Sequence, residues 1–186
     1  MAPRVAPGAI GITLVAAAIM AAALAWPLPW LTVHDGGDLR YAFPGGEGAR
    51  FTLRWMHSVE KEDWEEWFEV GKSGAIMLTG TRFKTFGAGV PAAAGTATRL
   101  DNGWVVMTGI DRAVDPLAVQ AAAAERYRMR YHLGPFEPTF ALSRAEPPPV
   151  LTFSVKRAPL WRVLPALVRP WRLAYSFERD TGANSQ

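Results

Sequence analysis

The sequence contains no cysteine, so disulfides cannot hold its fold together. An oxidising compartment is still permitted, but the stability of the protein must come from its hydrophobic core. The sequence also lacks internal repeats and any linker long enough to separate two domains. Its 186 residues therefore predict one domain with an appendage.

Histidine is scarce, and the motifs of common enzyme classes are absent. There is no Gly-x-Ser-x-Gly elbow, no phosphate-binding glycine loop with lysine and no His-Glu-x-x-His helix. The three histidines, His34, His57 and His132, lack the paired spacing of a metal site. We therefore expect no metal, no cofactor and no catalytic residue, and we predict that the protein is not an enzyme.

Charge is missing from the eighteen residues between Ala9 and Trp26. As a helix this run would be roughly 27 Å long, which is close to the thickness of a bilayer core. Residues 1–27 thus read as a membrane anchor or a signal segment, and the small-x-small pattern at residues 23–25 suits cleavage. We favour an uncleaved single-pass transmembrane helix, because a signal peptide has an apolar core of only about 7 to 15 residues. The bulk of the chain is then expected on the extracytoplasmic, periplasmic side of the cell membrane.

Residues 28–158 carry closely spaced turn signals and alternating apolar residues, which predict a mainly β domain. Asn102-Gly103 is the strongest hairpin signal, because both residues tolerate the positive φ of a tight turn. Asp115 and Pro116 look like the start of one short helix that runs to about Met129. The expected fold is an antiparallel sandwich or open barrel with one short helix, preceded by the N-terminal transmembrane helix.

Residues 51–70 predict a central hairpin with apolar residues at every second position. A reversal at Glu60–Asp63 would place His57 directly opposite Glu66 on an otherwise aromatic face. The other opposed pairs would be Val59 with Trp64, Trp55 with Phe68, and Leu53 with Val70. The remaining acidic residues of this run predict a solvated hairpin tip, and Glu65 falls on the face opposite His57.

The predicted pair of His57 and Glu66 has three interpretations. An unpaired carboxylate on an apolar face is costly, so the pair could simply fix the strand register. It could instead form a binding site or take part in catalysis. His57 cannot act with its neighbour Ser58, because consecutive strand residues point to opposite faces.

Two further segments are candidate contact surfaces. The candidate contact segment comprises Ser58, Gly87, Ala88, Gly89 and Pro91. The glycines form a turn or bulge, which needs no function, but whose exposed backbone could approach a ligand or partner. Residues 159–186 form a basic segment interrupted by prolines, and no acidic residue lies between Glu146 and Glu178. The membrane-surface or partner candidates in and beside this segment are Arg157, Trp161, Arg162, Arg169, Trp171 and Arg172. An ordinary solvated basic face is the alternative, and we expect no nucleic-acid partner.

The run HSVEKEDWEEWFEV followed by FGAGVP resembles the domain-of-unknown-function family numbered 1850. The matching positions are His57, Ser58, Val59, Glu60, Glu66, Gly87, Ala88, Gly89 and Pro91. The resemblance implies an association with tripartite ATP-independent periplasmic (TRAP) transporters of the TAXI type, and it brings no established catalytic residue.

The expected function is therefore that of a membrane-tethered extracytoplasmic accessory protein of a TAXI-type solute uptake system. It would act by contact with the transporter's membrane subunit or substrate receptor. The alternative is an extracytoplasmic ligand-binding module or enzyme that uses the face of His57 and Glu66. A structural envelope protein without a transporter is a third possibility.

Overall fold

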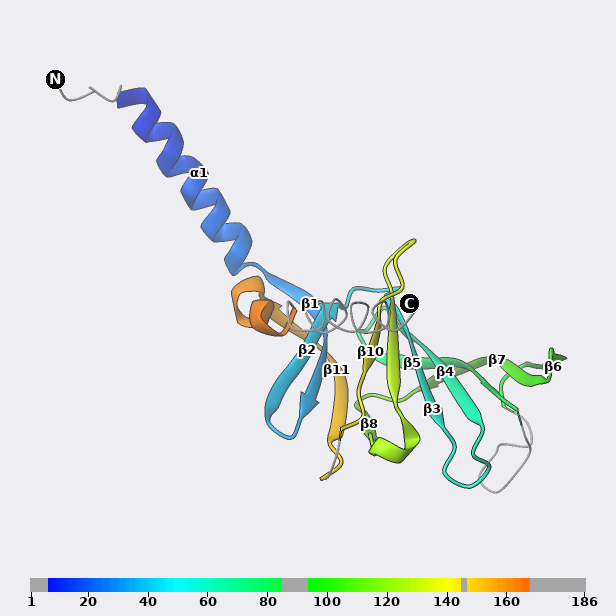
Figure 1. Ribbon diagram of the computed structural model, residues 1–186. Helices are drawn as coiled ribbons and strands as arrows, with labels where there is room; N and C mark the ends of the chain where they lie inside the picture. Colours follow the sequence, from blue (N-terminus) through cyan, green and yellow to red (C-terminus); the bar gives the residue numbers. More distant parts are fainter. Residues whose placement is uncertain (1–6, 85–93, 145–146, 168–186) are drawn as a thin grey trace, which may run out of the picture.

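The computed structural model describes residues 7–84, 94–144 and 147–167, with side chains from residue 11 onward (Figure 1). One long helix is followed by a domain of antiparallel strands. In chain order the elements are α1 (Pro7–Ala25), β1 (Pro27–Asp35), β2 (Asp38–Pro44), β3 (Arg50–Met56), β4 (Asp63–Val70), β5 (Ile76–Phe83), β6 (Ala97–Asp101), β7 (Trp104–Ala113), β8 (Leu117–Gln120), the 3₁₀ helix η1 (Ala123–Glu125), β9 (Arg128–His132), β10 (Thr139–Ala141) and β11 (Val150–Pro159). A helical segment over residues 160–167 follows β11.

Helix α1 projects away from the β-domain (Figure 1). All its described side chains are exposed. The predicted N-terminal helix is thus present. Within the described ranges, no helix is both long and apolar enough to cross a membrane.

The strands form two antiparallel sheets, which confirms the prediction of a mainly β fold. The smaller sheet has the order β2-β1-β11-β8, and the larger has the order β10-β9-β3-β4-β5-β7-β6. The larger sheet fans out beyond the smaller one, so only part of its inner face is covered (Figure 1). The result is an open, sandwich-like arrangement.

The main core lies between the two sheets. Phe51 is fully buried at its centre, stacked on Phe68 at 4.9 Å and on Phe153 of the smaller sheet at 5.7 Å between ring centroids. A second cluster covers the other face of the smaller sheet and contains Trp30, Ala42, Val163 and Ala166. A third lies where the larger sheet extends past the smaller one and contains Trp64, Phe83, Val105 and Met107.

The predicted turn at Asn102-Gly103 is confirmed, and a tight turn also joins the first two strands. Asp35 and Asp38 pair across the first hairpin, and Asp101 pairs with Trp104 across the Asn102-Gly103 turn. Asn102 and Gly103 both have positive φ, at 47° and 80°, as the sequence indicated.

The predicted helix from Asp115 to Met129 is wrong. Residues 117–120 form β8 instead, where Leu117 and Val119 pair with Phe153 and Leu151 and pack against the main core. After the short η1, Met129 and Tyr131 become fully buried on β9, opposite Leu53 and Phe51. The alternation of these apolar residues outweighs the helix propensity of the alanines between them, because tertiary burial overrides propensity.

Candidate functional site

The central hairpin of β3 and β4 is present, but its register differs from the prediction. Trp55 lies opposite Trp64 and Leu53 lies opposite Glu66, so the predicted cross-strand pair of His57 with Glu66 is wrong. The loop over residues 57–62 is longer than expected, and Lys61 adopts a positive φ of 58° within it. This longer loop lets Phe51 stack on Phe68 and Trp55 stack on Trp64, which the predicted register would have separated.

His57 organises the loop rather than contacting Glu66. Its backbone N–H donates to the carbonyl of Glu62 at 2.8 Å, and its own carbonyl accepts from Lys61 at 3.0 Å. Its ring Nδ1 accepts from the backbone N–H of Glu60 at 3.3 Å, and the ring stacks on Trp64 with centroids 5.4 Å apart. These contacts favour a structural role for His57.

Glu66 faces inward between Leu53 and Thr81, next to the aromatic residues of the hairpin. Within the part of the chain that the structure describes, no hydrogen bond or ion pair to its carboxyl group is present. Burial raises the pKa of Glu66 to about 7, and the positive charge of Arg112 only partly opposes this shift. The Glu66 carboxyl is therefore much easier to protonate than an exposed glutamate.

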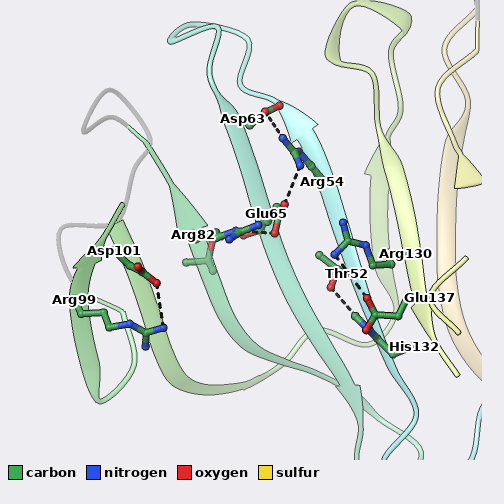
Figure 2. A network of polar contacts seen from close by, with 11 residues as sticks. Thr52, Arg54, Asp63, Glu65, Arg82, Arg99, Asp101, Arg130, His132 and Glu137 are labelled. Carbon is green, nitrogen blue, oxygen red and sulfur yellow. Dashed lines mark hydrogen bonds and ion pairs between the residues drawn. The ribbon is translucent and has the colours of Figure 1, made fainter. Parts of the chain in front are cut away.

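The outer face of the same hairpin holds a network of ion pairs (Figure 2). Glu65 is only 2% exposed, and its Oε2 accepts from Arg82 Nε at 2.8 Å while its Oε1 lies 3.4 Å from Arg54 Nη1. Arg54 also donates to Asp63, and this bond lowers the pKa of the Asp63 carboxyl. The predicted solvated tip is therefore wrong for Glu65, because two guanidinium groups hold its charge in a buried position.

A second polar group lies farther along the outer face, where β3 meets β9. His132 Nε2 is 2.9 Å from the hydroxyl of Thr52, and its Nδ1 is 2.8 Å from Glu137 Oε1 (Figure 2). The hydrogen bond from His132 lowers the pKa of Glu137. The outer face is thus charged and paired, whereas the inner face is aromatic.

The remaining predicted contact residues are dispersed. Ser58 is exposed in the hairpin loop. Gly87, Ala88, Gly89 and Pro91 lie outside the described residues, as do Arg169, Trp171 and Arg172. Within the described ranges, no group of three or more acidic or histidine side chains is placed to hold a metal ion.

Three of the predicted membrane-surface residues, Arg157, Trp161 and Arg162, lie in the described part of the chain, near the end of α1. Pro27 pairs with Pro159, which brings residues 160–167 beside the end of the helix (Figure 1). Arg157 Nη2 donates to the carbonyl of Pro27 at 3.0 Å, and the Arg162 guanidinium lies 5.1 Å from the centre of the Trp161 ring. Four large apolar side chains are exposed here, and we call them the apolar collar: Trp26, Leu28, Trp161 and Leu164.

Residues 51–134 match the family model of a domain of unknown function, DUF1850. The match confirms the family that the two sequence motifs indicated. The DUF1850 segment contains the inner-face Glu66 and the outer-face ion pairs, but it excludes α1 and the apolar collar. No curated protein and no solved structure matches the chain.

Sequence reasoning missed the network around Glu65. Arg54 and Glu65 occupy the polar phase of their alternating strands, which was a usable signal. A register irregularity in β5 takes Arg82 out of the phase set by Ile76 and Leu78, so its outward position was not readable from the alternation. The predicted register placed Arg54 opposite Glu69, however, whereas the observed register places it opposite Glu65. A shift in one hairpin loop was enough to hide the buried ion pairs.

Proposed function

We propose that this protein is a membrane-tethered accessory protein on the extracytoplasmic side of the cell membrane, serving a TRAP-type solute uptake system of the TAXI kind. It acts by contact with the membrane subunit or the substrate receptor, without catalysis of its own. The DUF1850 match supports the family, and the transporter association follows from what the sequence resemblance implies.

The apolar collar is the observation that carries the tethering part of the proposal. Trp26 is 65% exposed and Trp161 is 57% exposed, although they come from opposite ends of the β-domain. Both lie at the root of α1, where aromatic side chains and nearby arginines suit the interface between a membrane and water. Scattered exposed apolar residues need no explanation, but a cluster at the end of an uncharged helix points to an apolar surrounding.

The helical segment over residues 160–167 is firmly seated, so the collar is a fixed surface. Val163 is 2% exposed and Ala166 is 3% exposed, and both pack on Trp30 and Ala42. The same segment turns Trp161 and Leu164 outward. The β-domain would thereby sit against the membrane in one orientation, with the central hairpin directed away from α1 (Figure 1).

Two measurements on the full chain test this proposal. Alkaline carbonate extraction should leave the chain in the membrane fraction, and release into the supernatant would contradict the tether. A tagged chain purified in mild detergent should retain the transporter's membrane subunit or receptor. If neither component is ever retained, the accessory role is wrong.

A matched pair of variants separates the apolar collar from general surface hydrophobicity. The double variant Trp161→Ser with Leu164→Ser should reduce retention of the transporter component. Leu100→Ser removes an apolar side chain that is 80% exposed on β6, away from the collar, and should leave retention unchanged. Equal retention by all three proteins would exclude the apolar collar as a contact surface.

A further inference from the structure

A hollow of about 160 Å³ lies on the outer face where β9 separates from β3. The paired region of these strands ends at Arg54 and Arg128, because the chain before β9 turns away through η1. The hollow is smaller than typical ligand pockets of roughly 300 to 1,000 Å³, so it suits a small ion rather than a large molecule. Its lining residues are Arg54, Trp55, Met56, Asp63, Arg126 and Arg128.

Positive charge is in excess around this hollow. Arg54 and Arg128 lie directly opposite each other across the two strands, an arrangement of like charges that destabilises a sheet. Asp63 is the lone carboxylate of the lining, and it is already bonded to Arg54. In the described part of the chain, no carboxylate lies within ion-pair distance of Arg126 or Arg128.

The local backbone holds Arg126 at the hollow. Its φ of 51° is left-handed, a conformation that costs free energy for a residue with a side chain. The side chain turns toward β3, where its Nη2 lies 3.2 Å from the thioether sulfur of Met56. Thioether sulfur is a weak acceptor, so most of the donor capacity of this guanidinium remains available.

We propose that this hollow is a binding site for a small oxyanion of the carboxylate or phosphate type. Guanidinium groups match the paired oxygens of such anions, and an anion placed here would give Arg126 and Arg128 the counter-charge that neither has among the described residues. Met56, whose side chain lies on the same face, supplies an apolar wall against which a short organic part can pack. The site is independent of the proposed transporter partner.

Titration calorimetry on the full chain in a nonionic detergent tests the site, using inorganic phosphate and malonate as separate probes at low ionic strength. At least one probe should bind saturably, and the tighter one identifies the anion class. The Arg126→Gln/Arg128→Gln double variant should weaken its binding by about tenfold or more, because it removes charge-assisted hydrogen bonds. Both arginines are exposed, so this variant should fold, which a melting curve verifies.

Two comparisons make the test specific. Arg99→Gln removes an exposed arginine on β6 that pairs with Asp101, well apart from the hollow (Figure 2), and should bind as the unaltered chain does. Arg128→Lys keeps the positive charge but loses the paired N–H donors of the guanidinium group. Its affinity for the anion should therefore lie between those of the unaltered chain and the double variant. The proposal is overturned if neither probe binds saturably, or if the double variant and Arg99→Gln bind alike, since that indicates diffuse electrostatic attraction.

Discussion

Glu65 and Glu66 are neighbours in β4, yet their carboxyl groups lie in opposite environments on the two faces of the sheet. Glu65 points to the outer face, where it is buried and contacts both Arg54 and Arg82. Glu66 points to the inner aromatic face, and burial raises its pKa to about 7. A carboxyl group taken from water must either gain charged partners or take up a proton, and this strand contains both solutions.

The two faces of the larger sheet also differ in the charge that they carry. The outer face keeps fixed ionic groups and leaves Arg126 and Arg128 available beside its hollow. The inner face packs Trp55 against Trp64 and Tyr127, with centroid distances of 5.8 and 5.2 Å, and tolerates charge poorly. The outer face thus carries the anion site that we propose, and the inner face forms part of the packed core.

Removing the charge of Glu65 should have the largest effect. Glu65→Gln leaves Arg54 and Arg82 without their shared carboxylate, and breaking a buried pair costs about 3 to 5 kcal/mol. Because both guanidiniums are partly exposed, we expect a loss of about 3 kcal/mol in the free energy of unfolding. Urea denaturation measures the loss, and Asp101→Asn, which breaks an exposed pair on the same sheet, should show no resolvable change.

Neutralising Glu66 should instead stabilise the protein, and the effect should depend on pH. A folded-state pKa of about 7, above the ordinary 4.5, means that stability from this group is complete below pH 4.5 and is lost as the pH rises through 7. Glu66→Gln should therefore be more stable than the unaltered chain by about 2 kcal/mol at pH 8 and equally stable near pH 4. Denaturation at both pH values checks this, and a variant less stable at pH 8 would contradict it.

The smallest effect concerns His57. His57→Ala removes the stack on Trp64 and the ring contact with the Glu60 backbone, so we expect a loss of about 1 kcal/mol. Combined with Glu66→Gln in a double-mutant cycle, it should show a coupling below about 0.5 kcal/mol, because the two side chains are not paired. A larger coupling energy would indicate a direct contact between His57 and Glu66, as the sequence predicted.

The turns were the most predictable part of this fold. Asn102-Gly103 specifies its own hairpin, because positive φ at both residues is a local requirement that the residue types reveal. The alternation of the central hairpin likewise identified its two strands and its inner face. Those features depend on neighbouring residues alone.

Register and long-range pairing were not predictable in the same way. The loop over residues 57–62 sets which residues of β3 and β4 oppose each other, and stacking of Trp55 on Trp64 selects the longer loop. Similarly, Leu117 becomes part of a strand because β11, more than thirty residues later, pairs with it. The ion pairs of Glu65 depend on that register, so the outer-face site could not be assembled from the sequence.

The most direct test of the contrast between the two faces is a carbon-13 NMR titration of the side-chain carboxyl of Glu66 in the full chain. Our account predicts a pKa of about 7 for this group. The Glu66→Gln variant assigns the resonance, because the signal of the Glu66 carboxyl disappears from its spectrum. A measured pKa at or below the ordinary value of 4.5 would show that the inner face accepts a charged carboxylate, and the contrast with Glu65 would be wrong.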